Sequence, residues 1–250
     1  MSHRAHIATL RCYDSLNDFL KSKNRGKDFE VRFNISPSAK DLIESAGVPH
    51  TEVAAVTING CRSTLQYNVR SGDRIDVYPR SGEASGREDP DGKTLPHRFV
   101  ADIHLGKLVR LLRLTGVDTA YSKTPNDKQI VECAVREQRG VLTRDIELLK
   151  HGELDFGFGY WLRSTDPDSQ ILEVIDYFEL HDHLAPFTRC LSCNGNLKSV
   201  SLQNVSHRVP ENVRAWCTEY VQCNRCNKVY WKGSHYDKLQ KKVGKIFENI

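Results

Sequence analysis

The residues with the clearest chemistry are four cysteines in two C-x-x-C pairs. Cys190 and Cys193 form the first pair, and Cys223 and Cys226 form the second. Two thiolate pairs at this spacing are the ligands of a closed tetrahedral zinc site, and such a site is structural because no position stays open for water. We therefore predict one structural zinc ion bound by these four residues.

Redox chemistry is the alternative for a C-x-x-C pair, but neither pair lies in a thioredoxin-like βαβ context. Cys217 and His235 are candidate replacement ligands that two complete pairs leave unneeded. The interval 194–222 is longer than in a compact ribbon, so an excursion is expected to project from the zinc core. Aromatic and basic residues interleave around the second pair, which suits either stacking on single-stranded bases or packing of a small core: Tyr220, Arg225, Lys228, Tyr230, Trp231, Lys232 and Tyr236.

Three acidic residues in the middle of the chain form the second candidate site. Asp102 and Asp145 each follow a short apolar strand and precede a helix, and Asp127 begins another helix. Ligands gather at the carboxyl edge of open α/β sheets, so the three carboxylates are expected around one sheet edge. Singly, each also fits a helix cap. Together they predict a site for Mg²⁺ or Mn²⁺, which activates water for phosphodiester hydrolysis and makes clustered carboxylates tolerable.

Basic residues lie close to these acids in the sequence. Lys107, Arg110 and Arg113 recur every three residues on the helix after the first acid, so we expect them to share one side and meet a phosphate backbone. Arg144 and Arg163 are expected to act likewise. The alternative for each is an ion pair within the protein.

The elements that must position these residues fall into successive segments. Residues 81–97 are rich in Gly, Ser, Pro and charge, which predicts a linker, and a second break lies near 184–188. The expected parts are therefore 5–80, 98–183 and 184–250. In the first part, strands, a helix and further strands indicate an α+β sheet with the helix on one face.

The first part resembles the ubiquitin-like β-grasp domains, especially their sulfur-carrier branch. The resemblance rests on the run from Val56 to Gly60 and on the run from Gly72 to Pro79. Carriers of that kind end in a free Gly-Gly, whereas this chain continues through Arg80 and Ser81. The resemblance therefore implies a binding or scaffold role.

The middle and last parts resemble the Mut-seven C-terminal ribonuclease family, which is PIN-like. The similar stretches are 99–113, 116–119, 141–145, 162–167 and the zinc module up to His235. The resemblance implies a PIN fold whose acids hold Mg²⁺ or Mn²⁺ and hydrolyse RNA, and it maps these acids onto Asp102, Asp127 and Asp145. Relatives usually carry two adjacent acids where this chain has Asn126 and Asp127. Glu132 is a candidate substitute, or else part of a solvated helix face.

Composition limits the class of protein. The net charge of +4 and the 39% hydrophobic content fit a globular chain, and no apolar run approaches the ~20 residues of a membrane span. The N-terminus lacks signal-peptide features and the cysteine usage suits a reducing compartment, so a cytoplasmic location without membrane contact is expected.

We therefore expect a β-grasp domain, a PIN-like α/β parallel-sheet nuclease domain and a four-cysteine zinc ribbon with a basic C-terminal helix, acting together as a metal-dependent ribonuclease. One alternative is a non-catalytic RNA-binding or ribosome-associated protein, in which the acids are helix caps. Another is an adaptor whose β-grasp domain recruits a protein partner in sulfur transfer or translation.

Overall fold

The computed structural model describes residues 6–80, 95–124 and 126–250. Most of the linker predicted at 81–97 lies outside these described residues. The chain divides into two compact units, which are described separately. The first comprises Met1–Pro96 and Ala134–Trp161, and the second comprises His97–Cys133 and Leu162–Ile250. The boundaries inferred from the sequence stay predictions.

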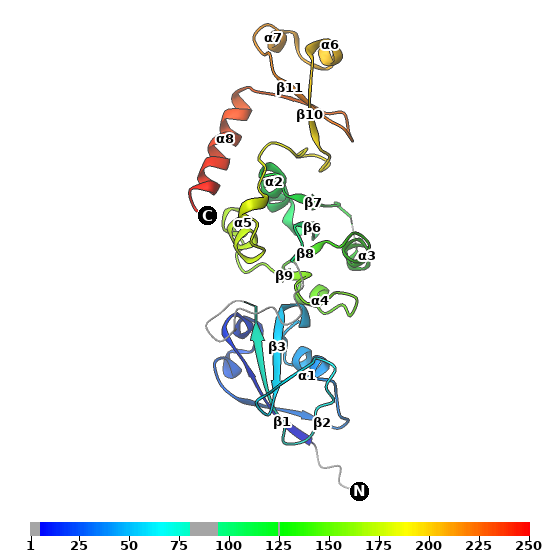
Figure 1. Ribbon diagram of the computed structural model, residues 1–250, viewed down its shortest axis with the longest axis vertical. Helices are drawn as coiled ribbons and strands as arrows, with labels where there is room; N and C mark the ends of the chain where they lie inside the picture. The colour runs from blue at the N-terminus through cyan, green and yellow to red at the C-terminus, as the bar shows by residue number, and fades with distance from the viewer. Residues whose placement is uncertain (1–5, 81–94, 125) are drawn as a thin grey trace. The chain divides into compact units, whose positions relative to one another are not determined.

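The first unit contains a five-stranded mixed sheet with a helix on one face (Figure 1). Its elements are β1 (His6–Cys12), η1 (Asp14–Phe19), η2 (Ser22–Asn24), β2 (Phe29–Phe33), α1 (Ala39–Ser45), η3 (His50–Glu52), β3 (Val53–Ile58), β4 (Cys61–Ser63) and β5 (Arg74–Pro79). The strand order is β2-β1-β5-β3-β4, and only β1 and β5 run parallel. Leu42 and Ile43 of α1 are buried in the core against this sheet. The β-grasp arrangement predicted from the sequence is confirmed.

Turns of this sheet follow from local sequence. Asn59 and Gly60 join β3 to β4 with φ angles of 52° and 79°, which suit an Asn-Gly hairpin turn. The Asp73 carboxylate lies in the turn before β5 and accepts hydrogen bonds from the Arg70 N–H, the Asn59 amide and the Tyr67 hydroxyl. Because Asp73 is only 6% exposed, these donors replace the water that its charge would otherwise need.

The first unit also contains a strand-helix-strand segment, formed by β8 (Gly140–Thr143), α4 (Ile146–Leu149) and β9 (Gly159–Trp161), in which β8 and β9 run parallel. The buried turn η3 contacts this segment. Glu52 accepts the Trp161 N–H at 2.7 Å, and the His50 ring lies 2.6 Å from the Glu44 carboxylate and 2.7 Å from the Leu154 carbonyl. The β-grasp domain therefore supports the segment that carries Asp145.

The second unit begins with a parallel pair of strands covered by helices. Its first elements are β6 (Arg98–Ala101), η4 (Ile103–Leu105), α2 (Gly106–Leu114), β7 (Asp118–Ala120), the start of α3 (Asp127–Glu137), α5 (Pro167–Tyr177) and η5 (His181–His183). α2 packs against α5 and β7. Phe99 of β6 meets Phe178 edge to face, with ring centroids 4.7 Å apart. Parallel strands, each followed by helical segments, confirm the α/β class with a parallel-sheet core.

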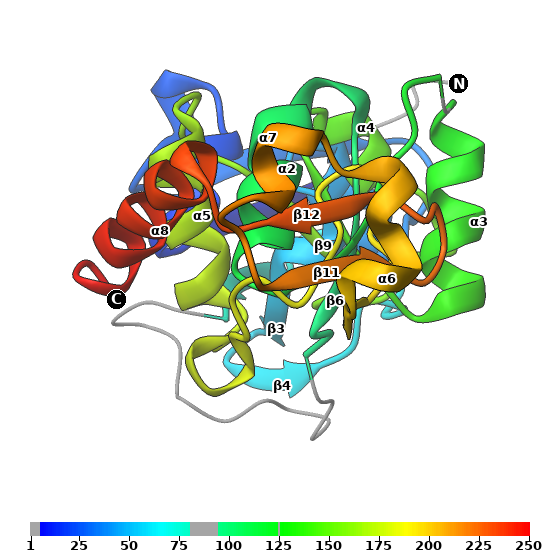
Figure 2. The ribbon, with the colours of Figure 1, turned by 90° about the horizontal axis from the view of Figure 1, so that it is seen from above.

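The second unit ends in a three-stranded antiparallel sheet and a long helix (Figure 2). The elements are β10 (Leu197–Val200), α6 (Leu202–Val205), η6 (Ser206–Arg208), α7 (Glu211–Arg214), β11 (Tyr220–Cys223), β12 (Val229–Trp231) and α8 (Ser234–Phe247). The helices between β10 and β11 form the predicted excursion. They share a small core with β11 and β12, in which Val205, Val209 and Val213 are buried with Tyr220.

Across the described ranges, every helix is too short or too polar to cross a membrane.

Candidate functional site

The four predicted zinc ligands converge in the second unit. Their sulfur atoms all lie within 4.8 Å of one another, with 3.4 Å between Cys193 and Cys223 and 3.7 Å between Cys190 and Cys226. Zinc–sulfur bonds of about 2.3 Å in a tetrahedron require sulfur separations of roughly 3.8 Å, so this donor set fits such an ion. Among the residues described, no other set of three or more His, Cys, Asp or Glu side chains converges in this way.

The two pairs share one backbone conformation. Asn194 and Asn227 follow the pairs with φ angles of 69° and 58°, and the N–H of each pair's first cysteine donates to the carbonyl five residues later. Gly195 is required at the first turn because an added Cβ would lie 2.7 Å from the Cys223 sulfur. Each knuckle is therefore shaped by its own local sequence, and the antiparallel strands β10 and β11 bring the two together.

Hydrogen bonds and burial shift the pKa values of the two thiols of the first pair in opposite directions. Burial by itself would raise the pKa of Cys190, but the Tyr230 hydroxyl at 3.1 Å and nearby backbone N–H groups outweigh it and lower this pKa to about 6. Burial and the neighbouring thiols instead raise the pKa of Cys193 to about 12. Within the first pair, Cys190 therefore loses its proton more readily than Cys193, and a bound metal would displace the proton of Cys193.

Arg113 corrects one expectation from the sequence. Its side chain is buried, at 4% exposure, and its guanidinium donates to the carbonyls of Thr119, Leu191 and Ser192 at 3.0 to 3.3 Å. Two of these carbonyls lie inside the first C-x-x-C pair. Burial lowers the pKa of Arg113, although the nearby cysteines oppose that effect. Arg113 therefore joins α2 to the metal site and does not present its charge to a phosphate backbone.

A second contact attaches the same knuckle to β7. The Asn194 side chain accepts the Thr119 N–H at 3.1 Å and donates to the Asp118 carboxylate at 2.7 Å. Arg189 forms an ion pair with Asp118 at 3.3 Å. Sequence reasoning missed these roles, although an Asn directly after a C-x-x-C pair is a signal for the left-handed turn that aims its side chain.

Other residues near the cysteines have structural roles. Cys217 is buried in the ribbon core and, like His235, stands outside the converging set. Tyr220 is buried in the same core, and Trp231 packs against it. The Tyr230 hydroxyl lies 3.1 Å from the Cys190 sulfur, so each of these three aromatic residues has contacts within the ribbon.

Asp102 lies directly after β6 and is 9% exposed. It caps η4, because its carboxylate accepts the Ile103 N–H at 2.5 Å. The Tyr121 hydroxyl donates to the Ile103 carbonyl at 2.8 Å, and an added Cβ at Gly106 would lie 3.0 Å from the same hydroxyl. The turn that carries Asp102 is therefore closely packed on its Tyr121 side.

Asp145 and Asp127 are exposed and also lie at helix starts. Asp145, in the first unit, caps α4 by accepting the Glu147 N–H at 2.9 Å. Asp127 is the first residue of α3, but the cap is Asn126, which exchanges hydrogen bonds with Gln129 in a capping box. These three carboxylates are not among the sets that converge within the described residues. Asp145 belongs to the first unit and Asp102 and Asp127 belong to the second, so their convergence stays a prediction.

The other candidate residues from the sequence differ in their exposure to solvent. Lys107, Arg110 and Arg144 are exposed, and Arg163 is partly buried. The Arg144 guanidinium lies 5.9 Å from the Trp161 ring centroid. Glu132 is exposed and 3.9 Å from Lys128, which agrees with a solvated helix face.

Two families of known proteins match the chain. A family described as the Mut7-C RNAse domain matches residues 97–243, which include the four cysteines and the three candidate acids. A second family, described as Mut7-C ubiquitin, matches residues 5–85. No curated protein and no solved structure matched the chain.

Proposed function

Since the chain belongs to the Mut7-C RNase domain family, we propose that it is a metal-dependent ribonuclease whose site is built on Asp102, Asp127 and Asp145. The observation that carries this proposal is the position of Asp102 and Asp145. Each follows a parallel strand, directly or by one residue, and precedes a helical segment. The carboxyl ends of such strands are where α/β proteins bind ligands.

The donor set suits the proposed cation, because carboxylate oxygens are the ligands that Mg²⁺ and Mn²⁺ prefer. A cation held there would supply Lewis-acid activation of water and stabilise charge on the phosphodiester. The backbone N–H groups that donate to the Asp102 and Asp145 carboxylates orient both of them before any substrate arrives. Lys107 and Arg110, on the helix after Asp102, are exposed and bind the RNA phosphates.

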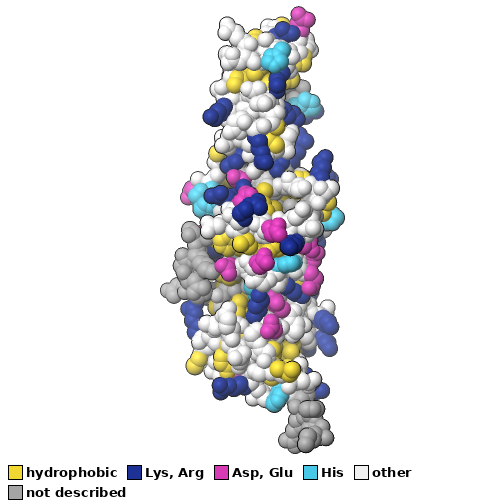
Figure 3. All heavy atoms as spheres, turned by 90° about the vertical axis from the view of Figure 1, so that its right-hand side faces the viewer, with side chains coloured by type: hydrophobic (Ala, Val, Ile, Leu, Met, Phe, Trp, Pro, Cys, Tyr) yellow, Lys and Arg dark blue, Asp and Glu magenta, His cyan; other side chains and the backbone are white. Residues whose placement is uncertain are grey.

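We further propose zinc as the ion of the four-cysteine cluster, with a structural role. The ribbon also brings positive charge. Residues 189–250 hold eleven Lys and Arg and four Asp and Glu, a net charge of +7 in a chain whose total is +4. Over the part that carries β10 and β11, most of the charged side chains on the face in Figure 3 are Lys and Arg. This charge favours RNA as the partner.

Cleavage of single-stranded and structured RNA with Mg²⁺ or Mn²⁺ tests this function. We expect metal-dependent cleavage that is lost in Asp102→Asn and in Asp145→Asn, since Asn keeps the helix caps but removes the charge. Glu132→Gln is the matched control, because it removes an exposed carboxylate from α3 and is expected to retain activity. Equal cleavage by all three variants would refute the assignment of the acids.

One observation favours a non-catalytic RNA-binding protein instead. Asp102 and Asp145 act as helix caps, and Asn126, where the family resemblance implies an acid, forms a capping box. In that case the same panel would show RNA bound and left intact with every metal. The ribbon would then be the recognition element, and removal of zinc would abolish binding.

A further inference from the structure

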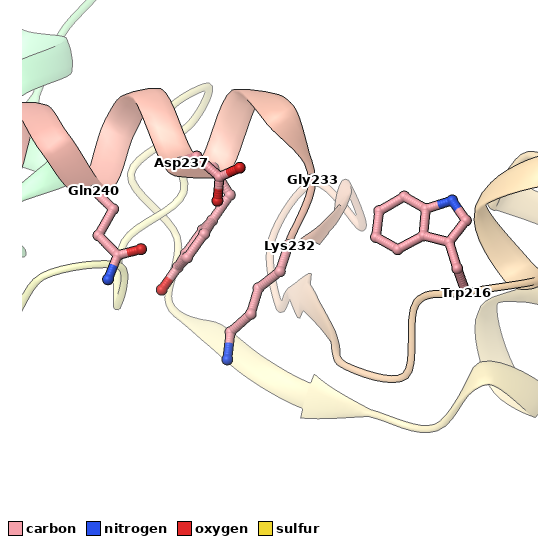
Figure 4. A pocket seen from close by; sticks show the side chains of 6 residues that line it. Trp216, Lys232, Gly233, Asp237 and Gln240 are labelled. Atoms are coloured by element: carbon pink, nitrogen blue, oxygen red, sulfur yellow. The ribbon is translucent and has the colours of Figure 1, made fainter.

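A pocket opens in the second unit between the loop after α7 and the first turns of α8. It has a volume of about 520 Å³, within the ~300 to 1,000 Å³ of small-molecule sites, and Figure 4 shows its lining side chains. Trp216 borders one side, and Asp237 and Gln240 of α8 border the other. Lys232, Gly233 and Tyr236 complete the lining.

Trp216 has a fixed backbone, and most of its side-chain surface meets solvent. It is 57% exposed and is not part of the ribbon core. Its backbone N–H donates to the Val213 carbonyl, and the next residue, Cys217, is buried. Its indole reaches Gly233 closely enough that an added Cβ there would lie 3.4 Å from the ring. An exposed indole beside a pocket offers a face on which an unpaired nucleobase can stack.

The facing helix is held as well. Lys242 of α8 forms an ion pair with Asp168 at the start of α5, and the Tyr236 ring packs 4.8 Å from the Phe187 ring. Ile246 of α8 is buried. α8 is therefore anchored, and the backbone at Trp216 is fixed, which lowers the entropy cost of binding.

The charges at the rim favour a neutral, flat occupant over a phosphate. Lys232 lies 2.6 Å from the Glu219 carboxylate, so its charge is already balanced, and Asp237 adds a negative charge. The Asp237 carboxylate and the Gln240 amide offer an acceptor and a donor for the edge of a base. The net charge of the surrounding ribbon attracts the attached phosphate backbone.

From these observations we infer that the pocket at Trp216 binds an unpaired base of single-stranded RNA by stacking. This inference rests on RNA being the ligand of the proposed function. Base binding is thereby assigned to the ribbon, and the proposed catalysis is assigned to the three acids. Duplex RNA, whose base faces are covered, does not fit.

Tryptophan fluorescence of the zinc-loaded, full-length Asp102→Asn protein tests the inference without cleavage. The probe is an oligoadenylate of ~8 nucleotides, and its duplex with oligouridylate is the comparison. We expect the single strand to quench the fluorescence and Trp216→Ala to weaken its binding roughly 5- to 150-fold, the value of one stacked base. The control is Phe247→Ala, which removes an exposed aromatic side chain that lies on α8 and outside the pocket. This variant is expected to bind like its parent.

Trp216→Phe keeps a stacking ring, so it retains most of the affinity but loses the quenching. Three outcomes would each overturn the inference. Trp216→Ala could bind within twofold of the parent, Trp216→Phe could still be quenched, or the duplex could quench as strongly as the single strand. Cleavage by the protein with Asp102 intact is scored separately. Loss of binding in Trp216→Ala with no cleavage anywhere would support this pocket while refuting the nuclease, and cleavage with unchanged binding would do the reverse.

Discussion

Arg110 and Arg113 lie one turn apart on α2, and we expect the same substitution to affect different properties at the two positions. Replacement of Arg113 should lower stability, whereas replacement of Arg110 should lower RNA affinity. Arg113→Met removes three hydrogen bonds from a buried guanidinium and leaves the carbonyls of Thr119, Leu191 and Ser192 without that donor. Hydrogen bonds from a charged donor contribute ~1.5 to 3 kcal/mol each. The cost of burying the charge, seen in the lowered pKa of Arg113, offsets part of this sum.

We therefore expect Arg113→Met to lower the free energy of unfolding by about 3 kcal/mol, which corresponds to a fall in Tm of ~6 to 12 °C for a chain of this size. Release of zinc to a chromogenic chelator should also become faster, because two of the lost hydrogen bonds hold the first knuckle. Arg110→Met should change stability by less than ~0.5 kcal/mol, since its side chain is exposed.

The RNA affinities should show the opposite order. Loss of one phosphate contact in Arg110→Met should weaken binding and reduce the slope of log affinity against log salt by ~1. Urea unfolding, chelator kinetics and binding at two salt concentrations measure all three quantities. The reasoning fails if Arg113→Met is as stable as the parent, or if it lowers affinity as Arg110→Met does while zinc release stays unchanged.

Two further predictions concern single residues. Gly195→Ala should lower zinc content and stability, because its Cβ would lie 2.7 Å from the Cys223 sulfur. Gly244→Ala has open space around its Cβ and should lower neither. Equal zinc content in both variants would contradict the knuckle geometry. Asp73→Asn should destabilise the β-grasp domain at pH 7 by roughly 1 to 2 kcal/mol. Burial would raise the pKa of Asp73, but hydrogen bonds outweigh it and hold this pKa below its usual value. The stability from the carboxylate is therefore present above about pH 4 and is lost as the pH falls through the folded-state pKa. Urea unfolding at pH 7 and pH 3 should show the gap between variant and parent narrowing in acid, and a gap of constant size argues against the depressed pKa.

Features that depend on neighbours in the sequence were predictable. The cysteine spacing and the Asn-Gly turn between β3 and β4 each place their groups within a few residues of chain. The strand-then-acid order at Asp102 is likewise local, because a strand end and the next helix start adjoin there. The family resemblance rests on these same stretches, and the matches over 97–243 and 5–85 confirm it.

Features that depend on burial required the tertiary structure. Lys107, Arg110 and Arg113 share a spacing of three residues, yet a helix of 3.6 residues per turn rotates each step by 60°, so their side chains do not point in one direction. The zinc knuckle covers only the last of them. Tyr220 and Trp216 differ in the same way, since both are aromatic residues of the ribbon but only Trp216 lies outside its core. Sequence determined which residues could bind metal, cap helices or stack, because those abilities reside in side-chain type and short-range spacing. The tertiary structure decided which of them face solvent, because burial depends on contacts between residues far apart in the chain.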